Sequence, residues 1–439
     1  MRRLLRLCSL SVLGMISAPP RLASAYHYVI GNDVVLRARP RADGELLRRL
    51  DHNETVVPRA APASGWQKVS VLGGQVGYLP TRALSNVWIR VLKKQRRLQL
   101  LHDKRVIKDY RLALSPGNAL GDKRQLGDNR TPEGRFYLAE MIRHPENRAR
   151  YGARSMRISY PSIRHARDGL ARRLFDYRRY LAIVKAIRQG RLPDQRTKLG
   201  SSIRIHGGGS RSDWTAGCMA LDDADIRDLY DRVRHGTRVE IYRSRRQAET
   251  LAAPDALAAG VLAGARAQLK APARYTRYAM GAPSIAYPNG DIRRSDAVCS
   301  DIIVRAVRRV GIDLQAAVHE DRLLHPERYR RGERPNSRID HRRVRNLHRY
   351  LLAHALRGDP RQTAKTARPG DLVLFDTGIQ NGTPFDHIGI VDDQRGADGV
   401  YRVVNIWTVG HRTSSMALVG RSYPTVVGHF RWGHPFDYH

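Results

Sequence analysis

The chain has 439 residues, 41% of them hydrophobic, so it is long enough for more than one core and too apolar for a wholly disordered protein. Its formal net charge of +37 comes mostly from arginine spread over the whole length, and this favours acidic partners such as anionic lipids or acidic envelope polymers. No recognition motif accompanies the charge, so nucleic-acid binding is not expected.

The first 25 residues have the pattern of a cleaved export signal. Arginines at the start are followed by a short apolar run over residues 7–16 and by Ala23-Ser24-Ala25 before Tyr26. We expect export to the periplasm or cell wall, and a net charge of +33 after four arginines are lost (37 − 4). No later stretch reaches about 18 apolar residues, so no transmembrane anchor is expected after processing. A retained N-terminal anchor is the alternative.

Two cysteines, Cys218 and Cys299, remain once Cys8 leaves with the signal. Thiols of exported proteins meet oxidising conditions and are usually either paired or used chemically. A disulfide between these two is one interpretation. Each of them, however, lies in a motif of its own, which favours two separate thiol sites.

Residues 26–86 contain short alternating segments broken by Gly, Pro and Asp, which predict a small β-structure. The segments LRARP, GWQKV and GYLP together resemble a bacterial SH3 domain. The resemblance implies a small β-barrel of the kind that binds wall peptides in exported proteins. Packing against the neighbouring domain is the alternative role.

Residues 87–243 begin with alternating strands, pass through the turn-rich GDNRTPEG stretch and include a basic, helix-compatible segment over 171–191. The segment IHGGG predicts a strand that ends at His206 in a glycine-rich turn, and TAGCMAL follows it. An imidazole can take the proton of a nearby thiol, and Gly217 lets backbone amides approach a reacting carbonyl. A core thiol and a hydrogen-bonded turn histidine are the alternative.

The motifs IHGGG and WTAGCMAL, preceded by GDNRTPEG and RISYP, resemble the YkuD-type L,D-transpeptidase domain. The resemblance implies a β-rich sandwich with Cys218 as nucleophile and His206 as general base. It also implies that the amides of Gly217 and Cys218 stabilise the oxyanion, while Gly207 and Thr215 shape the site. The cysteine would accept a stem-peptide acyl group and pass it to an amine or to water.

Two positions depart from the commonest family pattern. Ala216 replaces a histidine, and Ala220 replaces an arginine that often follows the cysteine. These features resemble the branch that includes hydrolases acting on stem peptides. The choice between cross-link formation and hydrolysis therefore stays open.

Residues 244–260 are polar and then alanine-rich, which predicts a linker that runs into a helix, and residues 261–439 are expected to have a helical middle and a β-rich end. Apolar residues at helical spacing follow Cys299, which places this thiol at a helix N-terminus, where the dipole favours the thiolate. His387 lies on one predicted strand and Asn405 lies on the next. This order matches a papain-type arrangement of nucleophile, base and orienting group. A core histidine is the alternative for His387.

Five segments of this part, AYPNGDIRRSDAVCSD, GIDLQ, IDHRRVRNL, RPGDLV and DHIGIV, resemble an uncharacterised exported family related to papain-like cell-wall amidases and peptidases. The resemblance implies Cys299 as nucleophile, His387 as base and Asn405 as the group that orients the imidazole. Asp340, His341 and Arg342 match a family motif that is either a salt-bridge cluster or a substrate contact.

The sequence thus predicts a multi-domain fold: an SH3-like β-barrel, a β-rich YkuD-type sandwich and an α+β papain-like domain. The predicted function is a two-thiol enzyme that acts on peptidoglycan stem peptides. A non-catalytic wall-binding scaffold and a secreted effector that attacks a wall or a host protein remain as alternatives. No metal-ligand spacing, phosphate loop or dinucleotide fingerprint is present, so neither metal nor cofactor is expected.

Overall fold

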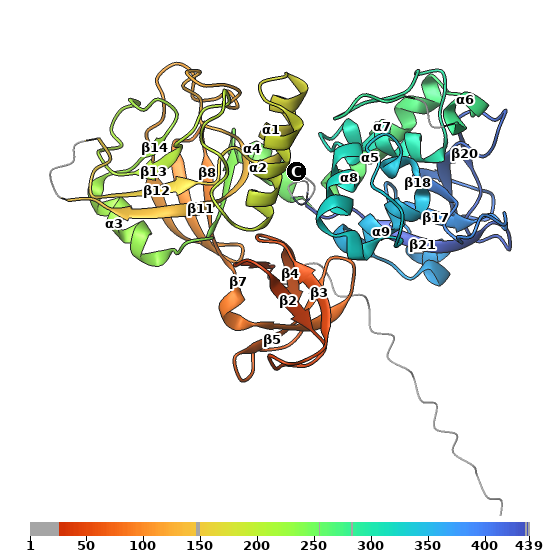
Figure 1. The fold of residues 1–439 in the computed structure, drawn as a ribbon, viewed down its shortest axis with the longest axis horizontal. Coiled ribbons are helices and arrows are strands. Elements are labelled where there is room, and N and C mark those ends of the chain that lie inside the picture. Colours follow the sequence, from red (N-terminus) through yellow and green to blue (C-terminus); the bar gives the residue numbers. More distant parts are fainter. Residues whose placement is uncertain (1–25, 146–149, 254, 282–283, 435–436, 438–439) are drawn as a thin grey trace, which may run out of the picture.

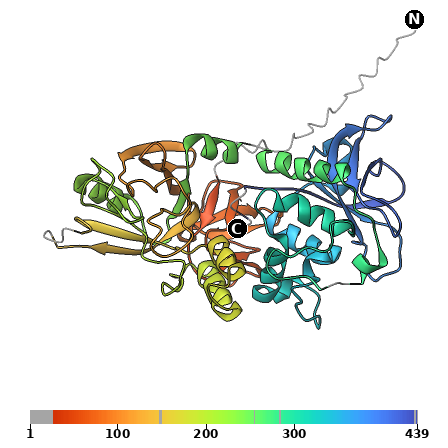
Figure 2. The same cartoon turned by 90° about the horizontal axis from the view of Figure 1, so that it is seen from above.

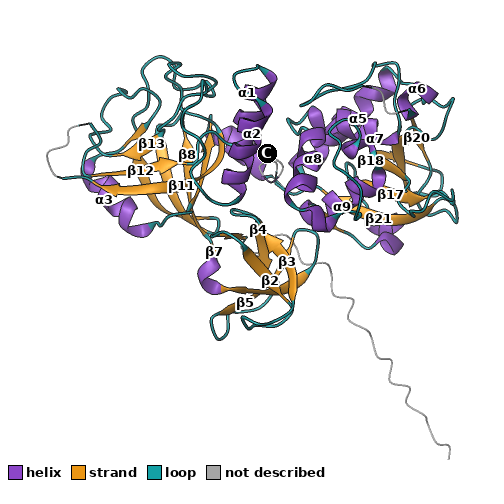
Figure 3. Cartoon of the chain, viewed as in Figure 1, coloured by secondary structure: helices purple, strands orange, loops and turns teal. Residues whose placement is uncertain are grey.

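The computed structural model describes residues 26–434 and residue 437, apart from 146–149, 254 and 282–283. The predicted export signal, residues 1–25, lies outside the described residues. Within the described residues the chain forms three β-sheets, two of them accompanied by α-helices (Figures 1 and 3). No helix in this described part has both the length and the apolar character needed to cross a membrane.

The N-terminal sheet is antiparallel, with the strand order β3-β2-β6-β5-β4-β1-β7. Its strands are β1 (His27–Val29), β2 (Val34–Arg37), β3 (Leu46–Leu50), β4 (Thr55–Pro58), β5 (Trp66–Val71), β6 (Val76–Pro80) and β7 (Leu84–Ser85), with the short helix η1 (Thr81–Ala83). Alternate residues such as Val34 and Leu36 point into a core with Val56, Val69 and Leu79. The strands predicted from LRARP, GWQKV and GYLP are confirmed as β2, β5 and β6. The SH3 resemblance stays a prediction.

The middle sheet has the order β10-β9-β8-β15-β11-β12-β13-β14, and its pairs are antiparallel except β8 with β15 and β13 with β14. Its strands are β8 (Val87–Leu92), β9 (Arg97–His102), β10 (Arg105–Arg111), β11 (Gly134–Arg143), β12 (Arg154–Ile158), β13 (Arg204–His206), β14 (Met219–Ala220) and β15 (Arg238–Tyr242). Its helices are α1 (Ile163–Ala171), α2 (Tyr177–Arg188) and α3 (Asp223–Arg232). Ser162 and Asp176 cap α1 and α2 by accepting from backbone amides.

The C-terminal part places helices before a sheet with the order β16-β21-β17-β18-β19-β20. The helices are α5 (Ala256–Lys270), α6 (Arg277–Met280), α7 (Cys299–Arg308), α8 (Leu314–Leu324), η2 (Pro326–Arg328), η3 (Asp340–Arg342), α9 (Val344–His354), η4 (Pro360–Gln362) and α10 (Thr363–Thr366). The strands are β16 (Leu356–Arg357), β17 (Leu372–Asp376), β18 (His387–Arg395), β19 (Tyr401–Asn405), β20 (Ser414–Met416) and β21 (Thr425–Arg431). The predicted helical middle and β-rich end are confirmed, whereas a papain-like fold stays a prediction.

The core of the C-terminal part lies between α7 and the sheet. Ile302, Ile303 and Ala306 of α7 are buried in one cluster with Ile388 and Ile390 of β18. Because the apolar residues recur at helical spacing, one face of α7 lies on the strand. The packing fixes the start of the helix against the start of β18.

Residues 244–260, predicted as a linker that runs into a helix, are largely helical. They hold α4 (Arg245–Ala252) and the first turn of α5, which begins at Ala256. The oxygen of Ser244 caps α4, and Leu257 and Val261 of α5 join the C-terminal core. The alanine-rich end of the segment predicts the helix that begins there, because alanine has high helix propensity, whereas the polar first half was predicted as linker and forms α4.

The three parts pack against one another, with α1 and α2 between the middle sheet and the C-terminal helices (Figures 1 and 2). Arg167 of α1 forms a buried ion pair with Glu320 of α8 at 3.2 Å. Arg188 of α2 pairs at 2.9 Å with Asp51, which directly follows β3 of the N-terminal sheet. Gly73 lies so close to the carbonyl oxygen of Leu352 that a Cβ would be 1.6 Å from it. The α1–α2 segment therefore connects the parts as well as covering the middle sheet.

Candidate active sites

Strand register brings the first predicted pair onto neighbouring strands. Strand β13 ends at His206 and runs parallel to β14, with Ile205 opposite Met219 and His206 opposite Ala220. Cys218 immediately precedes β14, so strand spacing and rise put its backbone about 8 Å from that of His206. Two motifs separated along the chain by a glycine-rich turn thus lie on neighbouring strands.

The imidazole of His206 is buried between two aromatic rings. Its centroid is 5.2 Å from that of Tyr151 and 5.5 Å from that of Trp214. Nδ1 donates to the carbonyl oxygen of Gly207 at 2.7 Å, which leaves the lone pair on Nε2. Burial lowers the pKa of His206 to about 4, so the ring is neutral near pH 7 and can accept a proton.

The Cys218 thiol is half-buried and donates to the carbonyl oxygen of Ser202 at 3.6 Å. Burial raises the pKa of this thiol. The backbone amide and charge of Arg204, followed by the charges of Arg150 and Lys123, oppose the rise. The pair therefore rests as a neutral thiol and a neutral imidazole, and attack requires transfer of the proton to a base.

The backbone before the sulfur has two amides free for a reacting oxygen. Gly217 has a φ of +111°, and a Cβ there would be 2.8 Å from the carbonyl oxygen of Arg130. Thr131 Oγ1 donates to Gly217 O at 3.0 Å, and Thr215 Oγ1 donates to Cys218 O at 2.7 Å. Among the described residues no acceptor takes the amide of Gly217 or Cys218. Both amides can therefore stabilise an oxyanion.

Two acids at the start of α3 hold the glycine-rich turn, and the sequence interpretation missed them. Asp223 Oδ1 accepts from the amide of Gly208 at 3.1 Å, and Asp222 Oδ1 accepts from that of Ser210 at 2.8 Å. A Cβ at Gly207 would be 2.0 Å from Asp223 Oδ1, which explains the glycine there. An acidic pair before a helical pattern is an N-terminal signal that could have identified them.

Lys93 was missed as well, because the pair Lys93-Lys94 after a strand resembles an exposed edge. Its side chain is fully buried, and Nζ donates to the carbonyl oxygens of Gly121 at 2.8 Å and Thr131 at 2.9 Å. It also pairs with Glu133 at 2.9 Å. Since Thr131 holds the carbonyl before Cys218, Lys93 positions the backbone of the site.

The second set of predicted residues also meets. Cys299 is the first residue of α7, His387 the first of β18 and Asn405 the last of β19. His387 Nε2 donates to Asn405 Oδ1 at 3.2 Å, which leaves the lone pair on Nδ1. The backbone amide of Ile388 bonds the Cys299 sulfur, so the sulfur lies beside the residue that follows His387. The Trp407 ring lies 4.8 Å from the imidazole.

Both groups of the second pair are buried and neutral. Burial raises the pKa of the Cys299 thiol to about 12. The amides of Ile388 and Ser300 oppose this rise, and the nearby carboxylate of Asp301 adds to it. Burial lowers the pKa of His387 to about 4. Cys218 and Cys299 are both free thiols, so the disulfide interpretation does not apply.

The motif at 340–342 supports the start of α7. Arg342 binds Asp301 with two hydrogen bonds of 2.9 Å, and Asp301 Oδ2 accepts from the amide of Val298 at 2.8 Å. Ser300 Oγ donates to the carbonyl oxygen of Arg342 at 2.9 Å. Asp340 is buried in ion pairs with a histidine and an arginine. Asp340 and Arg342 thus form salt bridges, and Arg342 contacts Ser300 and Asp301, the two residues that follow Cys299.

Two family models match the chain. Residues 86–241 match the L,D-transpeptidase catalytic domain, YkuD, and residues 262–432 match a domain of unknown function, DUF1287. The first match covers His206 and Cys218, and the second covers Cys299, His387 and Asn405. The middle part is therefore an L,D-transpeptidase catalytic domain of the cysteine type.

Individual relatives cover parts of the chain. The uncharacterized protein YijF of Escherichia coli (strain K12) is 33% identical over 152 residues, which are 34% of this chain and 70% of YijF. The Campylobacter jejuni cell shape determining protein Pgp2 is 19% identical, with 42% of this chain and 56% of Pgp2 covered and a TM-score of 0.28. Bd1075 of Bdellovibrio bacteriovorus is 20% identical, with 36% and 48% covered and a TM-score of 0.24. The chain spans about half the length of these two solved structures.

Proposed function

The chain belongs to the family of the Escherichia coli protein YijF, and we propose that this member is an exported enzyme that remodels peptidoglycan by cysteine acyl transfer on stem peptides. One observation carries the proposal. In the L,D-transpeptidase catalytic domain, the neutral imidazole of His206 lies on the strand next to a thiol that is flanked by two free amides. Periplasmic or wall-associated localisation is part of the same proposal.

The proposed reaction uses each group once. Cys218 Sγ attacks the acyl carbon of a stem peptide while Nε2 of His206 accepts its proton, and the amides of Gly217 and Cys218 hold the oxyanion. Collapse of the tetrahedral intermediate breaks the peptide bond, and the departing amine takes the proton from the imidazole. An amine or a water molecule then attacks the thioester and releases Cys218.

We further propose that Cys299, His387 and Asn405 form a second hydrolytic site that acts on the same polymer. Asn405 fixes the tautomer of His387, and the start of α7 presents the sulfur beside β18. Free amides at a helix start favour negative charge on the sulfur once a proton acceptor is beside it. The second site would give the chain an amidase or peptidase activity of its own.

The test treats purified sacculi with the native chain, with Cys218→Ala, with Cys299→Ala and with the double variant. Ser212→Ala, at an exposed position between His206 and Cys218, is the control. We expect each single variant to lose a different set of muropeptide products, and mass spectrometry to find a stem-peptide acyl adduct on Cys218. Identical profiles from the native chain and the double variant contradict the proposal and favour a wall-binding scaffold.

A further inference from the structure

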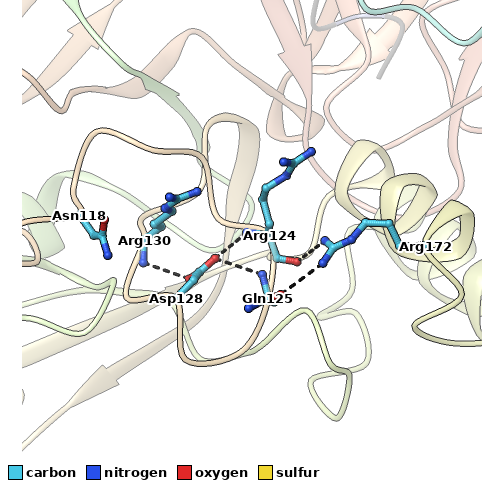
Figure 4. A pocket seen from close by; sticks show the side chains of 6 residues that line it. All are labelled: Asn118, Arg124, Gln125, Asp128, Arg130 and Arg172. Atoms are coloured by element: carbon cyan, nitrogen blue, oxygen red, sulfur yellow. Dashed lines mark hydrogen bonds between the residues drawn. The ribbon is translucent and has the colours of Figure 1, made fainter.

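A cavity of about 370 Å³ lies in the middle part, outside the two thiol sites (Figure 4). The residues that line it are Asn118, Arg124, Gln125, Asp128, Arg130 and Arg172. Three of these six are arginines and one is an acid, so the cavity is cationic. Its volume suits a group the size of one or two amino-acid residues.

The single acid of the lining is already used by the protein. Asp128 accepts from the ammonium group of Lys123 at 2.7 Å and from the amides of Arg124 at 2.7 Å, Gln125 at 3.1 Å and Arg130 at 3.1 Å. These bonds explain why the pKa of Asp128 is lowered even though burial opposes the shift. The carboxylate therefore shapes the loop and does not neutralise the arginines.

Two of the three guanidinium groups have no partner among the residues that the structure describes. Arg172 donates to the carbonyl oxygen of Arg124 at 2.9 Å and to Gln125 Oε1 at 3.3 Å, so it ties α1 to the loop. Among the described residues, the side chains of Arg124 and Arg130 have neither an ion pair nor a hydrogen bond, and Nε of Arg130 is buried without one. Both side chains extend from the same side of the loop (Figure 4). They are positioned to bind one anionic group together.

The loop that carries these arginines touches the backbone of the first thiol site. The carbonyl oxygen of Arg130 faces Gly217, and the neighbouring Thr131 holds Gly217 O at 3.0 Å. The side chain of Arg130 packs on Gly121, where a Cβ would be 2.7 Å from its Nε. The side chain of Arg130 is about 7 Å long. Its guanidinium group can therefore be reached by a bound peptide that extends about three residues from an acyl group at Cys218.

We infer that this cavity is a subsite for a carboxylate of the peptide substrate, bound by Arg124 and Arg130 while the reacting carbonyl lies at Cys218. The inference rests on the proposed function and specifies its substrate as an acidic peptide with a carboxylate within about three residues of the acyl carbon. Planar guanidinium groups bind carboxylates through paired hydrogen bonds, and the fixed loop limits the entropy lost on binding.

The test measures binding calorimetrically with the full chain carrying Cys218→Ala, so that turnover does not interfere. The probes are a synthetic acidic stem tetrapeptide and the same peptide with its carboxylates amidated. We expect the acidic peptide to bind at least about tenfold more tightly. Adding Arg124→Gln and Arg130→Gln should remove this preference, the two lysine replacements should keep most of it, and Arg246→Gln on the exposed face of α4 should keep all of it.

Equal affinity of the glutamine double variant and its parent for the acidic peptide overturns the inference, as does a parent that does not bind this peptide. Circular dichroism melts of the variants exclude misfolding, which is not expected because both guanidinium groups lack protein partners in the described part of the chain. Absence of a Cys218 acyl adduct in the native chain, with the binding preference intact, overturns the proposed function and leaves the subsite in place.

Discussion

The middle and C-terminal parts each bring a cysteine and a neutral histidine onto neighbouring elements, but they hold the two residues in different ways. Cys218 lies in a loop, is half-buried and is near the charges of Arg204, Arg150 and Lys123, whereas Cys299 begins a helix and is buried under a sheet. The acceptor of the imidazole N–H differs as well. It is a backbone carbonyl oxygen for His206 and a side-chain amide oxygen for His387. The same chemical unit can therefore be built with different access to solvent.

This difference in access predicts the largest measurable contrast between the two sites. Alkylation needs the thiolate, and a pKa of about 12 leaves Cys299 about one part in ten thousand ionised at pH 8. We expect iodoacetamide to modify Cys218 at least about 100-fold faster than Cys299 in the native chain, as measured by peptide mapping. The guanidinium-unfolded chain is the control, in which both should react alike. Equal native rates would remove the distinction between the sites.

Much of each site could be predicted from the sequence because the chemistry lies in local motifs. His206 and Cys218 are placed by a strand end and a glycine turn, and Cys299 by a helix start. The supporting groups could not be predicted in the same way. Lys93 supports the first site from the turn after β8, and Arg342 supports the second from another helix.

The fold could be predicted to a similar extent. Strands with alternating side chains and the apolar face of α7 gave clear patterns, whereas α4 lies in a strongly polar segment of which Ala248 is the buried residue. Contacts between parts, such as Arg167 with Glu320, join residues far apart in the sequence and have no local signal. Tertiary packing rather than propensity decides such features.

Lys93 offers the next largest effect and separates the two sites. Lys93→Met removes the donor for the carbonyl oxygens of Gly121 and Thr131, and we expect the free energy of unfolding of the middle part to fall by about 3 kcal/mol. Acylation of Cys218 should slow because Thr131 no longer holds Gly217 firmly, while labelling of Cys299 stays unchanged. Urea unfolding and adduct formation measure the two effects. The exposed Lys94→Met is the matched control, and equal behaviour of the two variants contradicts the positioning role.

The smallest effect tests what the two sites share, which is a buried histidine whose pKa is lowered to about 4. A base acts only when unprotonated, and a lowered pKa keeps His206 and His387 in that form well below their usual titration range near 6.5. Each single-cysteine variant should therefore keep more than about 90% of its base in the active form at pH 5.5, whereas a histidine of ordinary pKa would keep about a tenth. Single-turnover acylation rates between pH 3.5 and 8 measure this, with circular dichroism at each pH as the control for folding. An acid limb centred near pH 6.5 in one variant alone would show that its imidazole is solvated when substrate binds, and the two sites would then differ in the state of the base as well as in access to the sulfur.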